Sequence, residues 1–163
     1  MPASRFCQAI ESSPLGQTIP HFTWLWPAIE SLHVVTLVVL VASITTFDLR
    51  LMGLAFRRLR VSDLGNRLLP STWGAFGVMI LTGTLLFTPF AARKYCYNPA
   101  FQTKLILILL AGINMSVFHF TIYRDVSKWD ETSSTPLLAK VVGSLSVLLW
   151  ASVVVAGRLI GFF

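Results

Sequence analysis

Four long apolar stretches limit what this chain can fold into. Each is long enough to cross a bilayer as a helix, because a hydrocarbon core of about 30 Å needs roughly 20 residues at about 1.5 Å per residue. They are separated by short polar, charged or proline-containing segments, and they span residues 22–47, 72–92, 101–123 and 137–160. The sequence therefore predicts an all-α fold, an integral membrane antiparallel four-helix bundle in contact with membrane lipid.

The composition agrees with this fold class and with a single domain. Only 12% of the residues are charged and 55% are hydrophobic, whereas about a quarter of an ordinary soluble domain is charged. No long polar linker interrupts the chain, so we expect one transmembrane domain over residues 1–163. The net charge of +6 does not indicate a nucleic-acid partner, because the basic residues gather between the apolar stretches rather than along one face.

The segment before the first span has a different pattern. Within residues 6–20, Phe6, Ile10 and Leu15 are separated by polar residues, which predicts a short amphipathic segment on the membrane surface. This segment lacks the charged start of a cleavable signal peptide, so we expect the first span to remain in the membrane.

The distribution of Lys and Arg predicts the orientation of the bundle. Eight of the 13 basic residues follow the first and third spans: Arg50, Arg57, Arg58, Arg60, Arg67, Arg124, Lys128 and Lys140. The side richer in Lys and Arg faces the cytoplasm, so both termini are expected to face outward. The same topology puts Cys7 and Cys96 on the outer side, where an oxidising compartment favours a disulfide between them; the alternative is two free thiols.

The three histidines carry most of the candidate chemistry. His33 and His119 lie inside expected spans, where ionisable groups are costly and are functional candidates by default. Glu30 precedes His33 by three residues and shares its helix face, so its carboxylate is placed to orient the imidazole as a ligand or proton carrier. Asn114 lies about one helical turn from His119.

This pattern is typical of a b-type haem site, because histidines on bundle helices commonly bind haem iron and methionine is the next common ligand. It predicts His33 and His119 as the ligands of the haem iron, with Glu30, Met79 and Asn114 as further cofactor-binding residues. The alternatives are proton or metal handling, or histidines that only hydrogen-bond a neighbouring helix.

The expected depths of the two histidines argue against a single haem held by both. Counted from the inner boundary, His33 lies about 22 Å deep and His119 about 7 Å deep at about 1.5 Å per residue. Ligands on opposite faces of one haem need nearly equal depth. Either the first span is shifted inward, or each histidine has another partner. Met79 lies near the expected depth of His119, and His21 lies near the outer level.

Several motifs resemble a bacterial family of integral membrane proteins of unknown function. They cover nearly the whole chain and comprise Glu30-Ser-Leu-His33, Phe47-Asp-Leu-Arg50, Leu69-Pro-Ser-Thr-Trp73, Thr82-Gly-Thr-Leu-Leu-Phe87, Tyr97-Asn-Pro-Ala-Phe101, Phe118-His119, Tyr123-Arg124 and Ala156-Gly157-Arg158. More distantly, the chain is similar to HemJ-type protoporphyrinogen oxidases and the CopD-like membrane domain. The shared pattern is His33 in the first span, with Lys104 and His119 at the two ends of the third. The HemJ-type resemblance implies haem association at His33, and any enzymatic activity would be that of a membrane oxidoreductase of this type. The N-terminal segment and the pair Asp48 and Arg50 depart from that pattern.

The sequence and the resemblance together predict a small bacterial inner-membrane protein with both termini in the periplasm. It would bind haem b and transfer electrons, with quinone or a redox protein as partner. A copper-handling or transport protein that uses His21, His33 and methionines is a second interpretation, although the chain has only four methionines. The third is a non-catalytic subunit of a larger membrane complex, and a homo-oligomer is also open.

Overall fold

The computed structural model describes residues 2–130 and 135–162, and its regular elements are all helical. The helices are α1 (Pro2–Glu11), α2 (Pro14–His21), α3 (Leu25–Met52), α4 (Val61–Phe87), α5 (Pro99–Val117), α6 (Val126–Trp129) and α7 (Leu137–Leu159). Short 3-10 or π-helical turns extend α4 and α5: η1 (Thr88–Phe90), η2 (Ala91–Tyr95), η3 (Phe118–Ile122) and η4 (Tyr123–Asp125). The predicted all-α helical bundle is confirmed.

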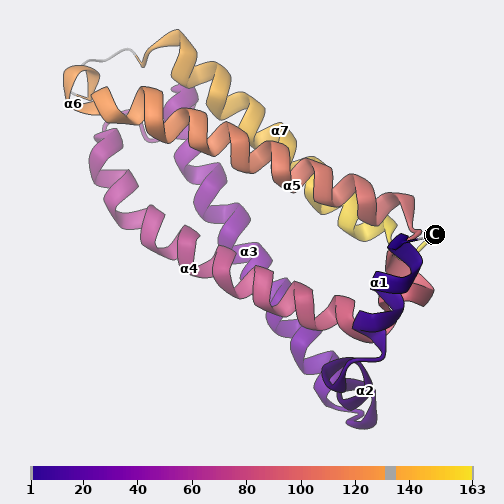
Figure 1. Ribbon diagram of the computed structural model, residues 1–163. Helices are drawn as coiled ribbons and strands as arrows, with labels where there is room; N and C mark the ends of the chain where they lie inside the picture. The colour runs from indigo at the N-terminus through magenta and orange to yellow at the C-terminus, as the bar shows by residue number, and fades with distance from the viewer. Residues whose placement is uncertain (1, 131–134, 163) are drawn as a thin grey trace.

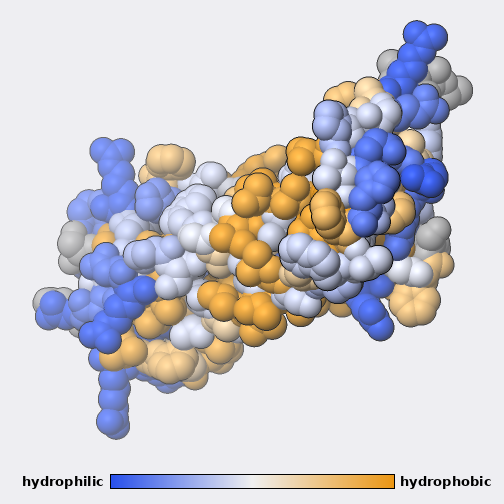
Figure 2. Space-filling model, turned by 90° about the horizontal axis from the view of Figure 1, so that it is seen from below, coloured by the Kyte–Doolittle hydropathy of each residue, from blue (hydrophilic) through white to orange (hydrophobic). Residues whose placement is uncertain are grey.

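Four helical segments of the described chain are long and apolar enough to cross a membrane. They are Leu25–Met52, Val61–Tyr95, Pro99–Asp125 and Leu137–Leu159. Figure 2 shows hydrophobic side chains gathered over the middle of the molecule and strongly hydrophilic ones at its two ends. Many large apolar side chains on these helices are exposed, among them Leu109 at 64% and Phe120 at 73%. A surface of this kind is suited to lipid rather than water.

Among the long helices, α3 packs on α4 and α7, and α7 also packs on α5. A close approach between α3 and α7 occurs at Gly143 on α7. A Cβ placed there would lie 3.2 Å from Leu51 Cβ and 3.3 Å from the backbone oxygen of Asp48. The missing side chain lets the two backbones come together, which is how membrane helices associate without a hydrophobic driving force.

The N-terminal segment folds over one end of the bundle, which we call the cap end. Ser13 caps the start of α2, because its hydroxyl accepts a hydrogen bond from Gly16 N at 3.3 Å and Pro14 supplies a favourable first helical residue. Helix α1 packs on η1 and η2, and α2 packs on η1. In Figure 1 the C-terminal end of α7 lies beside α1 at this end, while α6 lies at the opposite end, called here the α6 end.

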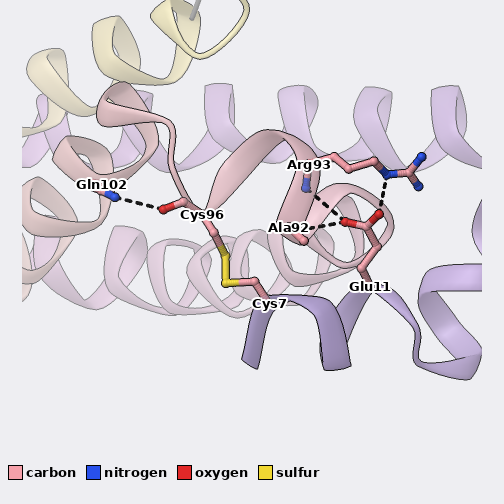
Figure 3. The surroundings of a disulfide bond; sticks show 6 residues. All are labelled: Cys7, Glu11, Ala92, Arg93, Cys96 and Gln102. Atoms are coloured by element: carbon pink, nitrogen blue, oxygen red, sulfur yellow. Dashed lines mark hydrogen bonds and ion pairs between the residues drawn. A yellow bond between two sulfur atoms is a disulfide. The ribbon is translucent and has the colours of Figure 1, made fainter. Parts of the chain in front are cut away.

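Two kinds of link fasten α1 to η2 (Figure 3). Cys7 and Cys96 form a disulfide with their Cα atoms 6.6 Å apart. The Glu11 carboxylate accepts hydrogen bonds from Ala92 N at 2.8 Å and Arg93 N at 3.2 Å, and it pairs with the Arg93 side chain. The predicted amphipathic segment is therefore a packed part of the fold.

The second helix begins earlier than the expected span of residues 72–92, because α4 starts at Val61 and runs through Pro70. Proline removes one helical hydrogen bond. The extra turns are nevertheless stabilised by packing, since Val61 and Leu64 are buried in a cluster with Phe47, Leu51, Phe118, Ile122, Ala139 and Val142. The start of α4 is fixed by Asp130, a residue that lies outside α4. Its Oδ1 accepts hydrogen bonds from Val61 N at 2.5 Å and Ser62 N at 3.1 Å.

Candidate functional site

His33 lies on α3 in the half of the bundle nearer the cap end, and its ring is held by α4. Its Nδ1 lies 2.8 Å from the Thr82 hydroxyl oxygen. That hydroxyl also lies 2.7 Å from the Val78 carbonyl oxygen, so it can donate its hydrogen there and accept one from the imidazole. In this arrangement the proton is on Nδ1 and the Nε2 lone pair is free for a ligand.

Two glycines lie beside the polar groups of this region. A Cβ at Gly83 on α4 would lie 3.4 Å from His33 Cε1, and a Cβ at Gly157 on α7 would lie 3.4 Å from Lys104 Nζ, both ordinary contact distances. Lys104, from α5, lies within electrostatic range of His33. The four long helices therefore each contribute a residue to this level of the bundle: His33, Thr82, Lys104 and Gly157.

Glu30 is not the group that holds the His33 ring. Its side chain is exposed, and among the described residues the hydrogen-bond partner of the ring is Thr82. Sequence reasoning missed Thr82, because a threonine in an apolar span commonly only bonds its own helix backbone. Lys104 had a signal in the sequence, as a basic residue just inside the third span, but its position against Gly157 depends on how α5 and α7 pack.

His119 lies away from His33, on η3 near the α6 end. Its side chain is exposed and its ring stacks on Tyr123, with the ring centroids 5.7 Å apart. It lines a cavity that His33 does not reach. This separation agrees with the depth difference expected from the rise per residue, and the structure does not bring the two histidines together.

The other predicted site residues are divided between these two regions. Asn114 is buried, lines the cavity with His119 and donates a hydrogen bond to the Val142 carbonyl at 3.1 Å. Met79 is half-buried on α4, about one turn from Thr82 and outside the cavity lining. His21 is exposed at the end of α2. Within the described residues, no group of three or more His, Cys, Asp or Glu side chains is arranged to hold a metal ion.

The cavity near the α6 end has a volume of about 60 Å³ and is bordered by all four long helices. Its polar lining consists of Asp48, Thr72, Asn114, His119 and Ser146, and the remaining lining side chains are apolar. Asp48 is 5% exposed, and its Oδ2 has no hydrogen-bond partner among the described residues. Ser146 on α7 is close enough to interact with the Asp48 carboxyl.

Arg50, which follows Asp48 on the same helix, does not face the cavity. Its Nε donates to the Leu59 carbonyl at 2.7 Å, and Nη1 lies 3.3 Å from the Thr135 hydroxyl. Arg50 therefore fastens the α3–α4 connection to the segment before α7. Of this pair, only Asp48 lines the cavity.

Comparison with known proteins places the chain in one family. A family model described as "Family of unknown function (DUF6644)" matches residues 6–163. No curated protein and no solved structure matches the chain. The comparisons therefore give no similarity to HemJ-type oxidases or to CopD-like domains.

Proposed function

The chain belongs to DUF6644, a family of unknown function, and we propose that it is a membrane protein that binds b-type haem and transfers electrons. The observation that carries this proposal is the hydrogen bond between His33 Nδ1 and the Thr82 hydroxyl at 2.8 Å. A histidine that binds a metal through one ring nitrogen almost always donates its other N–H to a protein group. Thr82 provides that acceptor, so Nε2 of His33 is the nitrogen that would bind iron.

Lys104 supplies the second requirement of a haem site. Haem carries two carboxylate side chains, and an ammonium group is a suitable partner for them in a region of low dielectric constant. The Lys104 side chain is half-buried and packs on Gly157, within electrostatic range of His33. An imidazole for the iron and a cation for a carboxylate thus lie at one level of the bundle.

We propose His33 as the single protein ligand of the iron. His119 lies in the other half of the bundle, and among the described residues the hydrogen-bond partner of the His33 ring is Thr82 rather than Glu30. When bound, haem supplies a one-electron iron couple. The chain would hold the cofactor by His33, orient the imidazole by Thr82 and neutralise a carboxylate by Lys104, with quinone or a redox protein as electron partner.

We propose the bacterial inner membrane as the location, with both termini in the periplasm. The disulfide between Cys7 and Cys96 supports this orientation, because such bonds persist in oxidising compartments, and both cysteines lie at the cap end. The basic connection at the α6 end, which includes Arg57 and Arg58, agrees with a cytoplasmic side. A cysteine introduced as Asn66→Cys should then be shielded from a membrane-impermeant thiol reagent in whole cells; labelling there would reverse the orientation.

The test of haem binding is the reduced-minus-oxidised absorption spectrum of the purified protein, with a pyridine haemochrome assay for the amount of haem. We expect near-stoichiometric haem b in the wild type and its loss in His33→Ala. Thr82→Val should weaken haem retention by about 10–100-fold, the usual effect of losing an outer-shell partner, while Thr82→Ser should restore it. His21→Ala, in the cap, is the matched control and should keep its haem.

Two results would overturn the proposal. A colourless wild-type protein produced with ample haem would exclude haem binding altogether. Haem that is retained in His33→Ala and lost in His119→Ala would move the iron site to the α6 end of the bundle. Electron transfer is tested separately, by mixing the reduced protein with a soluble quinone and following the return of the oxidised spectrum.

A further inference from the structure

The cavity near the α6 end contains a buried carboxyl group that the proposed haem site does not use. We propose that Asp48 is a proton-binding site, at which a single proton is held inside the membrane and exchanges with the aqueous phase at the α6 end. This inference does not depend on haem, because Asp48 lies in the other half of α3 from His33.

The first argument is the state of the carboxyl group itself. Asp48 is 5% exposed, and Oδ2 has no hydrogen-bond partner among the described residues. An ionised carboxylate with an unsatisfied oxygen is strongly disfavoured in such surroundings, whereas a protonated one is neutral and can donate a hydrogen bond. A proton on Asp48 removes the charge and turns the unsatisfied oxygen into a donor.

The second argument is the cavity into which this carboxyl group opens. A volume of about 60 Å³ exceeds the roughly 10–15 Å³ that a buried water needs, and the lining provides the polar partners that such a water requires. Thr72, Asn114 and Ser146 are those partners, one from each of the other three long helices. The cavity can therefore hold water between Asp48 and its surroundings, and water is the medium through which a proton moves.

The third argument is the route to the outside. The titratable residues in the cavity lining are Asp48 and His119; the lining residues of α4 and α7 contribute none. His119 is exposed as well as lining the cavity, so it lies both inside and at the boundary. An imidazole in this position can accept a proton on one nitrogen and release one from the other. Since His119 is only five residues before Arg124, the exchange is with the aqueous phase at the α6 end.

A metal cation fits this site less well than a proton does. Hard cations such as Ca²⁺ take about six or more oxygen ligands, and among the lining side chains only Asp48, Thr72, Asn114 and Ser146 carry oxygen. A proton needs one oxygen, and Asp48 Oδ2 is available for it. The same donor set therefore favours the proton.

Infrared spectroscopy of the full-length protein in lipid nanodiscs tests the assignment, because a protonated carboxyl group in apolar surroundings has its own carbonyl stretching band. We expect this band at neutral pH, a shift of the band in D₂O, and its loss in Asp48→Asn. Asp63→Asn, which changes an exposed carboxylate on α4, is the control and should keep the band. Ser146→Ala leaves the carboxyl in place and should shift the band to higher frequency, because it removes the hydroxyl group beside the carboxyl.

His119→Phe tests the route, since it should slow the shift in D₂O without removing the band. Absence of the band from the wild type at neutral pH, or its survival in Asp48→Asn, would refute the proton site. A band that is present only when Na⁺ is withheld would show a metal-cation site instead, and it would equally overturn the proposal. Neither result bears on the haem spectrum, so the two proposals fail independently.

Discussion

Replacing Asp130 with alanine should remove the group that fixes the start of α4. Its Oδ1 accepts hydrogen bonds from Val61 N at 2.5 Å and Ser62 N at 3.1 Å, and its Oδ2 accepts one from the Ser62 hydroxyl. Asp130 is 8% exposed and Val61 is fully buried, so water can replace these bonds only in part. Loss of a helix N-cap costs about 0.5–2 kcal/mol, and a hydrogen bond to a charged group contributes about 1.5–3 kcal/mol. For Asp130→Ala we expect a loss of about 2–3 kcal/mol, because partial hydration of the freed N–H groups offsets some of the total.

The measurement is the free energy of unfolding in mixed micelles, with the fraction of a denaturing detergent raised stepwise. Asp125→Ala is the matched control, because Asp125 is an exposed carboxylate that pairs with Lys128 at the surface, and such pairs contribute little. Ser62→Ala and the double variant complete a cycle that measures the coupling between the two side chains. If Asp130→Ala loses no more stability than Asp125→Ala, α4 does not depend on this cap and our account of its start is refuted.

The same carboxylate predicts a pH dependence. Burial opposes ionisation of Asp130, but hydrogen bonds from the Ser62 hydroxyl and from the N–H groups of Ser62 and Val61, together with the positive charge of Arg60, lower its pKa below the ordinary value of 3.8. The stabilisation by Asp130 is therefore complete above that ordinary value and is lost as the pH falls through the lowered pKa of the folded state. The wild type and Asp130→Ala should thus converge in stability at strongly acidic pH and differ constantly near neutrality.

Two further predictions concern the cap end and the centre of the bundle. Burial opposes the charge of Glu11, but hydrogen bonds from Ala92 and Arg93 lower its pKa below 4.5. Protection of the cap from limited proteolysis should therefore be complete above pH 4.5 and be lost as the pH falls through the lowered pKa. Glu11→Gln should show weak protection at every pH. Gly143→Ala should destabilise the bundle by about 1–3 kcal/mol, because the new Cβ meets backbone atoms of α3. Gly77→Ala meets nothing within 4 Å and should cost no stability; equal losses for the two alanines would refute the close-approach argument.

The bundle could be predicted from hydropathy because lipid imposes one strong rule. A backbone in hydrocarbon must satisfy its hydrogen bonds within the segment, so an apolar stretch of sufficient length becomes a helix. The ends of the helices follow weaker and less local rules. Proline disfavours the interior of a helix, yet α4 starts nine residues before Pro70 and continues through it. Its first N–H group, that of Val61, is satisfied by the carboxylate of Asp130, which lies 69 residues after Val61 in the chain.

The candidate site was only partly predictable for a similar reason. His33, His119 and Asn114 stand out in the sequence because polar groups are rare in spans. The contacts made by Thr82, Lys104 and Gly157 depend on how the four helices pack. The spacing of residues within one helix does not predict such contacts. The unsatisfied oxygen of Asp48 is likewise a property of the assembled cavity, since the residue alone reads as an interfacial cap next to Arg50.

The disulfide between Cys7 and Cys96 also constrains the biogenesis of the protein. The two cysteines are 89 residues apart, and the chain between them contains the whole of α3 and α4. In the proposed orientation the bond can form only after the N-terminal tail has been translocated, both helices have been inserted, and the segment after α4 has emerged on the oxidising side. The oxidation state of this disulfide in pulse-labelled cells would therefore report the progress of membrane insertion. A molecule with reduced cysteines would be one in which the insertion of α3 and α4 is still incomplete.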